Sequence, residues 1–153
     1  MRKKIKENYL VCVDDSNEFL DALNYACFHA EKNSMGIILL YVIELENFRH
    51  WQGVENIMQK EQENKAKSAL KKIRKVINNK YKITIKNIIK RGEKVDKIIE
   101  VLNDEKIKIN ILILGLSLLE SDTNKIISSL TGSFRRKLSL PITIVPGKIK
   151  NGE

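Results

Sequence analysis

Residues 36–43 read GIILLYVI, an apolar run in which polar and apolar residues do not alternate. Alternation marks a strand with one face in water, so its absence indicates a strand that is covered on both faces. Residues 109–116, INILILGL, form a second run of this kind. Such strands are typical of parallel sheets flanked by helices, and we expect these two in the middle of the sheet.

Three further strands are predicted outside these runs. NYLVCV at residues 8–13 is short, apolar and followed by polar residues, as a buried strand is, and PITIV at residues 141–145 predicts the last strand. Residues 82–86 alternate Lys or Thr with Ile. This pattern, which ends at Gly92, predicts a more exposed strand near an edge of the sheet.

Four helices are predicted between the strands from apolar residues at helical spacing. They lie at residues 17–32, in a long segment that ends near Asn78 and Asn79, at about residues 94–104, and in a last segment with Ile127, Leu130, Phe134 and Leu138. Residues 44–56 lose this periodicity and are expected to form a loop or an irregular segment. The alternation predicts a single α/β domain over residues 1–153, an open parallel five-stranded sheet with helices on both faces.

The composition, with 42% hydrophobic and 31% charged residues, is that of a globular domain in water. No apolar run reaches the length of a membrane span, and Tyr9–Val13 is too short for the core of a signal peptide. We therefore expect a cytoplasmic protein without membrane contact. Cys12 and Cys27 are expected to be reduced core thiols, and no metal-ligand spacing joins them to a histidine.

The net charge of +9 is compatible with a nucleic acid or an anionic membrane as partner. The lysines are scattered over every segment, however, so we favour a general surface charge and do not expect a nucleic acid partner. Polyanion binding by the lysine-rich helix at residues 65–80 stays open as an alternative.

Ligands of open parallel sheets bind beyond the carboxyl ends of the strands, where the winding direction reverses. We expect the first and fourth strands to be neighbours there. Asp14 and Asp15 would then face Gly115, with Val42 and Ile43 close by. Asp14 could accept hydrogen bonds from a ribose or could cap the following helix, and Gly115 could admit a ligand or simply turn the chain.

Gly132 and Ser133 also have two interpretations. If the last helix begins at this pair, its free N–H groups, its dipole and the Ser133 hydroxyl would bind an anion such as phosphate. If it begins near Asp122 or Thr123, Gly132 is an interior glycine that costs about 1 kcal/mol. The P-loop, the GxGxxG, HExxH and GxSxG motifs are absent, so we predict no catalytic residue and do not expect an enzyme.

Taken together, YLVCVDDS, IILLYVIE, IIKRGEKVDKIIEVL, ILILGLS and LTGSFRRKLSLPITIVP resemble the universal stress protein family of the UspA type, over nearly the whole chain. The resemblance implies the strand order 3-2-1-4-5 of the adenine nucleotide alpha-hydrolase-like fold. It also implies a homodimer formed through the last strand, here Ile142 and Ile144, and in one branch of the family bound ATP.

The family's ATP motif, G-x2-G-x9-G-[ST], is only partly present. By resemblance, Gly115 is its first glycine and Gly132-Ser133 its closing pair, but Leu118 stands in place of the second glycine. Gly115 and Gly132 are 17 positions apart where the motif gives 13. The longer loop contains Glu120 and Asp122, which would repel phosphate unless they face away from it or hold a cation.

The resemblance further implies that Asp14 contacts the ribose and that the backbone of Val42 contacts the adenine. We therefore expect a cytoplasmic, homodimeric stress-response protein that binds ATP or another adenine nucleotide as a regulatory module. Slow hydrolysis of ATP and a bound divalent cation are left open. The alternative is a dimer without nucleotide that acts through protein contacts, for which residues 48–54 are a candidate surface.

Overall fold

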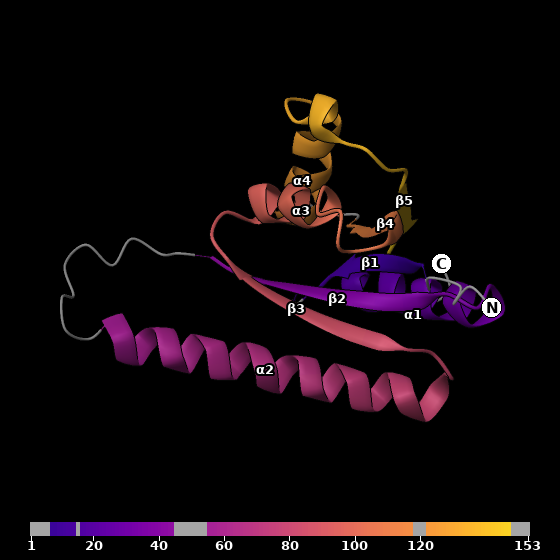
Figure 1. Ribbon diagram of the computed structural model, residues 1–153, viewed down its shortest axis with the longest axis horizontal. Coiled ribbons are helices and arrows are strands. Elements are labelled where there is room, and N and C mark those ends of the chain that lie inside the picture. The colour runs from indigo at the N-terminus through magenta and orange to yellow at the C-terminus, as the bar shows by residue number, and fades with distance from the viewer. Residues whose placement is uncertain (1–6, 15, 45–54, 118–121, 148–153) are drawn as a thin grey trace.

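A computed structural model describes residues 7–14, 16–44, 55–117 and 122–147. Its five strands form one parallel sheet in the order β3-β2-β1-β4-β5, which confirms the predicted fold class and strand order (Figure 1). The strands are β1 (Asn8–Cys12), β2 (Gly36–Ile43), β3 (Ile85–Arg91), β4 (Ile109–Leu116) and β5 (Ile142–Pro146).

The helices lie on both faces of this sheet, as predicted (Figure 1). They are α1 (Asn17–Lys32), α2 (Glu55–Lys80), α3 (Lys94–Leu102) and α4 (Asp122–Thr131), and a 3₁₀ turn, η1 (Arg135–Lys137), follows α4. Side chains of α1 and α2 pack on one face, and those of α3 and α4 pack on the other.

The central strands are buried on both faces, which explains their uninterrupted apolar sequences. Leu10 belongs to the core beneath α3 and α4, whereas its neighbour Val11 belongs to the core beneath α1 and α2. Leu39 and Leu40 of β2 divide between the two cores in the same way, and all four side chains are at most 1% exposed. Each successive residue therefore meets an apolar layer, and a polar side chain at any of them would lose its water.

Two predicted boundaries were wrong. The third strand runs from Ile85 to Arg91, because it pairs with β2 over that length, and residues 82–84 precede it. The long helix begins at Glu55, inside the segment expected to be irregular. The rest of that prediction, from residue 45 to residue 54, lies outside the described residues.

The last predicted helix is in fact shorter than the periodicity suggested. It ends at Thr131, and the N–H of Gly132 closes its final turn by donating to the Ser128 carbonyl at 2.9 Å. Phe134 and Leu138 still pack against the core beneath α3 and α4, although neither lies in the helix. Apolar spacing therefore identified the buried residues correctly but not the continuity of the helix.

Candidate functional site

Three of the predicted site residues lie together at the carboxyl ends of β1, β2 and β4. Cys12 is paired with Leu40, and Val11 with Ile113. Extending these registers by two residues puts Asp14 level with Val42 and Val13 level with Gly115. Because β1 is followed by α1 on one face and β4 by α4 on the other, this edge is the topological switch point of the sheet.

Asp14 is held at this edge by the start of α1. Its Oδ1 accepts the N–H of Ser16 at 2.7 Å and also the hydroxyl of Ser16. Ser16 is the N-cap of α1, and its Oγ accepts the N–H of Phe19 at 3.1 Å. Ser16 is therefore the residue that caps α1, and the Asp14 carboxylate holds Ser16 in place by accepting hydrogen bonds from its N–H and hydroxyl groups. The proposed contact of Asp14 with a ribose stays a prediction.

Gly115 has a packing role that the sequence did not reveal. A Cβ atom built on it would lie 2.5 Å from the carbonyl oxygen of Glu18 and 2.8 Å from its carbonyl carbon. The first turn of α1 therefore lies directly on the backbone of β4, and only glycine leaves room for it. Glu18 and Gly115 are 97 positions apart, so this contact has no local signal in the sequence.

The beginning of α4 lies at the same edge as Asp14. The side chain of Asn124, in the first turn of α4, accepts the N–H of Ser117 at 3.0 Å and donates to its carbonyl at 3.1 Å. Ser117 directly follows β4. The positive end of the α4 dipole consequently faces the carboxyl edge of the sheet.

Gly132 and Ser133 lie at the other end of α4. The helix has 10 residues, which corresponds to about 15 Å along its axis. Beyond Gly132, the carbonyl of Lys137 accepts a hydrogen bond from Asn103, at the end of α3. The structure therefore does not bring Gly132 and Ser133 to Asp14. The hypothesis of a helix that begins at this pair was wrong, because α4 begins at Asp122.

The remaining phosphate-loop predictions are only partly visible. Leu118 and Glu120 lie outside the described residues, as does the side chain of Asp122. Arg135, which follows Gly132 and Ser133 closely, is exposed and donates through Nη1 to the Gly132 carbonyl at 2.8 Å. The motif spacing counted from Gly115 leads to Ser128, which lies within α4. The closing glycine of the motif therefore does not lie beside Asp14, whether it is taken as Gly132 or is counted 13 positions from Gly115.

The pKa of the Cys12 thiol depends on two charged groups near this edge. Burial raises its pKa to about 12, the positive charge of Lys94 partly opposes this, and the negative charge of Asp14 adds to it. Lys94 and Asp14 therefore both act on the end of β1. Lys94 is a cation that sequence reasoning missed, and its position directly after the turn that ends the third strand is the signal that could have identified it.

Carboxylates also gather near the start of α3. A hydrogen bond with Asp96 raises the pKa of Glu93, and burial and the charges of Asp96 and Glu44 act in the same direction. Glu44 follows β2 and Glu93 is the N-cap of α3, so these groups lie at the carboxyl ends of β2 and β3. Carboxylates accept hydrogen bonds from hydroxyl groups, but they repel phosphate.

Within the described ranges, the structure offers neither a metal-binding cluster nor a membrane-spanning helix. No group of three or more His, Cys, Asp and Glu side chains there could hold a metal ion. No helix there combines the length and hydrophobicity that crossing a membrane requires. Both cysteines are free thiols, with Cys27 buried and Cys12 half-buried.

The chain is similar to universal stress proteins in sequence and in structure. The sequence profile of the Universal stress protein family matches residues 6–146. The universal stress protein UspA from Lactobacillus plantarum superimposes with a TM-score of 0.70 at 16% identity, over 94% of this chain and 99% of that one. No curated protein sequence matches the chain.

Two further solved structures share the fold. Hypothetical protein MJ0577, the subject of a structure-based assignment of biochemical function, gives a TM-score of 0.72 at 23% identity, over 94% of this chain and 98% of that one. A universal stress protein in complex with cAMP gives a TM-score of 0.56 at 18% identity, over 95% of this chain and 100% of that one.

Proposed function

This chain belongs to the universal stress protein family, and on that premise we propose that it binds an adenine nucleotide at the carboxyl ends of β1, β2 and β4. The observation that carries the proposal is the position of Asp14 and Val42, level with each other on neighbouring strands at the switch point. A relative with the same fold has been solved in complex with cAMP, an adenine nucleotide. In this proposal the protein is a cytoplasmic regulatory module and not a catalyst.

Each part of the nucleotide has a matching group at this edge. The Asp14 carboxylate accepts hydrogen bonds from the ribose hydroxyls, and the backbone of Val42 contacts the adenine. The phosphate lies toward the first turn of α4, beside Ser117, because the positive end of the helix dipole attracts anions there. This phosphate contact at α4 replaces the one first predicted at Gly132 and Ser133. Gly115 does not contact the nucleotide in this proposal, and its role is to leave room for the first turn of α1.

Asp14→Asn is expected to weaken nucleotide binding about tenfold to a hundredfold. The amide keeps an oxygen for the N–H of Ser16 but loses the charge that strengthens hydrogen bonds to the ribose. The measurement is isothermal titration calorimetry with ATP, ADP, AMP and cAMP. Asp104→Asn is the matched control, because Asp104 Oδ1 accepts the N–H of Lys106 at 2.9 Å in an equivalent turn at the opposite edge.

Two results would contradict the proposal. If the unmodified protein binds none of the four nucleotides, the proposed function is wrong. If Asp14→Asn and Asp104→Asn bind nucleotide with equal affinity, the proposed site at Asp14 is wrong. Mass spectrometry of the gently purified protein separates the proposal from its alternative. A co-purifying adenine nucleotide supports the regulatory site, whereas its consistent absence favours a family member that acts through protein contacts alone.

We propose in addition that β5 pairs with β5 of a second copy. β5 is an outer strand, and the Leu112 N–H donates to the Pro141 carbonyl and the Gly147 N–H to the Leu116 carbonyl. Odd-numbered residues of this strand therefore face β4, and the backbone groups of Ile142 and Ile144 face the free edge. The Ile144 side chain is 40% exposed.

The exposed face of α1 adds apolar surface near β5. α1 packs against β4 and β5, and a Cβ on Gly147 would lie 3.5 Å from the Glu18 Cβ. Tyr25 and Phe28 follow Glu18 at helical spacing and are 40% and 57% exposed. Apolar side chains on this side of α1 would be covered when two copies meet along β5.

Ile144→Pro is expected to weaken dimerisation about tenfold to a hundredfold, because it removes an outward N–H without disturbing the bonds to β4. Sedimentation equilibrium gives the dissociation constant. Ile144→Ala is the control, since it loses apolar contact but retains the N–H. A protein that is monomeric at all concentrations, or a proline variant that dimerises as well as the alanine variant, would contradict pairing through this strand.

A further inference from the structure

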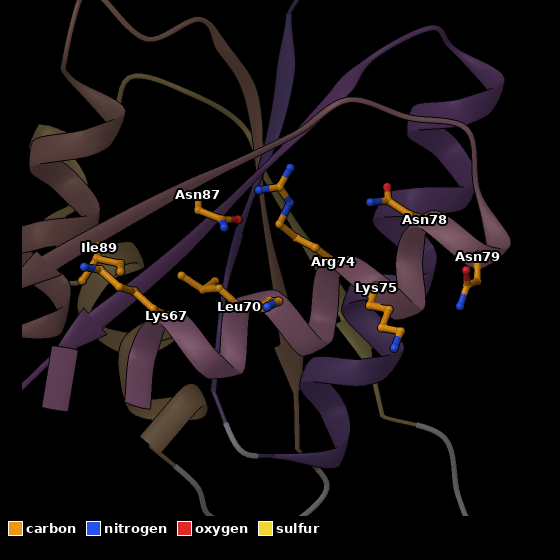
Figure 2. Close-up of a pocket in the computed structure, with 9 residues that line it drawn as sticks. Lys67, Leu70, Arg74, Lys75, Asn78, Asn79, Asn87 and Ile89 are labelled. Atoms are coloured by element: carbon orange, nitrogen blue, oxygen red, sulfur yellow. The ribbon is translucent and has the colours of Figure 1, made fainter. Parts of the chain in front are cut away.

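A groove of about 620 Å³ lies between α2 and the outer strand β3, away from the switch point (Figure 2). Four cations of α2 line one side of it, at the helical spacing that puts them on one face: Lys67, Lys71, Arg74 and Lys75. Figure 2 shows Arg74 extending from the helix toward the strands, with Asn87 and Ile89 of β3 on the opposite side.

Most of this positive charge is not neutralised by the protein. Lys67 is paired with Glu63 at 3.6 Å, but no ion pair in the described part of the chain includes Lys71, Arg74 or Lys75. No carboxylate is among the residues that line the groove, and these three cations are exposed. An anionic ligand would therefore meet unpaired positive charge along α2.

The other wall is the free edge of β3. The Ile37 N–H donates to the Thr84 carbonyl, and the Gly92 N–H donates to the Ile43 carbonyl. In a parallel pair both backbone groups of a residue point to the same side, and the side alternates along the strand. Even-numbered residues therefore face β2, and the N–H and carbonyl groups of Asn87 and Ile89 point to the edge that no other described strand occupies.

We propose that this groove binds an extended acidic peptide segment of a partner protein, which adds to β3 as a further strand. The backbone of the peptide would pair with Asn87 and Ile89, and acidic side chains at alternate positions would meet the cations of α2. Side chains on one face of a strand repeat about every 7 Å, close to the roughly 6 Å between Lys71 and Lys75 along the helix axis. One acidic residue in two thus matches this row of cations.

Two other occupants fit less well. Single-stranded nucleic acids bind through stacking on aromatic side chains, and no aromatic residue lines the groove within the described residues. A second copy of β3 would bring its own Lys86 to the same edge. Lys90 and Arg91 are paired with Glu100 and Glu63, but no ion pair among the described residues includes Lys86, and like charges across a strand pair are destabilising. The free strand edge beside unpaired cations instead fits an acidic segment of another protein.

The test uses a fluorescein-labelled peptide of seven residues in which Glu and Val alternate, and fluorescence anisotropy reports its binding. Lys71→Glu/Lys75→Glu is expected to weaken binding about tenfold or more, because it replaces attraction with repulsion in the groove. Lys65→Glu/Lys72→Glu is the matched control. It makes the same change in charge on exposed residues of α2 that do not line the groove, and it is expected to leave the affinity within about twofold.

A second probe separates strand addition from attraction by charge alone. The same peptide with N-methyl groups on every residue keeps its charge but cannot form the backbone ladder, and we expect no binding of it. Equal weakening by both double variants, or equal binding of the methylated peptide, would overturn the proposal. Tighter binding of a labelled oligo-dT, lost in Lys71→Glu/Lys75→Glu, would overturn it in favour of a nucleic acid. Thermal unfolding of both variants confirms that each is folded.

Discussion

Alanine in place of Gly115 is expected to lower the free energy of unfolding by about 2–3 kcal/mol, because overpacking a rigid contact costs this much. The new Cβ would lie 2.5 Å from the Glu18 carbonyl oxygen, a backbone atom that cannot rotate away. Moving Glu18 moves Phe19 and Ala22, which are 4% and 1% exposed. Urea denaturation followed by circular dichroism measures the loss.

Gly147→Ala is the control for this prediction. A Cβ on Gly147 would lie 3.3 Å from the Leu116 carbonyl oxygen and 3.5 Å from the Glu18 Cβ, a contact that a small shift relieves. We expect a loss of less than about 1 kcal/mol. Equal losses for the two variants would show that Gly115 is not a packing glycine, and its match to the first glycine of the nucleotide motif would then need a ligand as its explanation.

The central strands could be predicted from sequence because burial on both faces leaves a strong pattern. β2 and β4 have the predicted boundaries, residues 36–43 and 109–116, since apolar residues on both faces are buried along most of each strand. The strand β3 has one neighbour, and the alternation of Ile83 and Ile85 begins before Ile85, where the register with β2 starts. The beginning of an edge strand is thus set by its partner and not by its own alternation.

The candidate site could be predicted only where it follows from strand order. Asp14 and Val42 come together because β1 and β2 are neighbours with matched registers. The position of Gly132 depends instead on where α4 begins, and an apolar period that continues through Phe134 does not reveal that the helix stops at Thr131. The Gly132-Ser133 turn resembles the end of the nucleotide motif in sequence, but it lies one helix length away from the carboxyl edge of the sheet where the motif would bind phosphate.

The basic groove between α2 and β3 could not be predicted from the distribution of charged residues along the sequence. Along the sequence the lysines are scattered, and this pattern favoured a general surface charge. The helical period of α2 nevertheless gathers Lys67, Lys71, Arg74 and Lys75 on one side, next to a strand edge from a later part of the chain. The net charge of the chain does not predict such a surface, because the surface depends on which strand the helix packs beside.

The two cysteines are expected to react with iodoacetamide about a thousandfold more slowly in the folded protein than in the unfolded chain. Burial, the largest cause for each, raises the pKa of Cys12 and of Cys27 from 9.0 to about 12. Only the thiolate reacts, and three pKa units reduce its fraction about a thousandfold at pH 8. Mass spectrometry of samples alkylated for increasing times, with and without urea, measures both rates. Rapid alkylation of Cys12 in the folded protein would contradict the raised pKa of this half-buried thiol.

The same pKa shifts make stability depend on alkaline pH. Below pH 9 both states keep their thiol protons, whereas between about pH 9 and pH 12 the unfolded chain loses them and the folded protein does not. The free energy of unfolding therefore falls as the pH rises through this window, by about 3 kcal/mol for the two thiols at pH 10. Lysine and tyrosine also titrate there, so the comparison is with Cys12→Ala/Cys27→Ala, measured at pH 7.5 and pH 10. If this variant loses as much stability between the two pH values as the unmodified protein, the thiols are not the groups responsible.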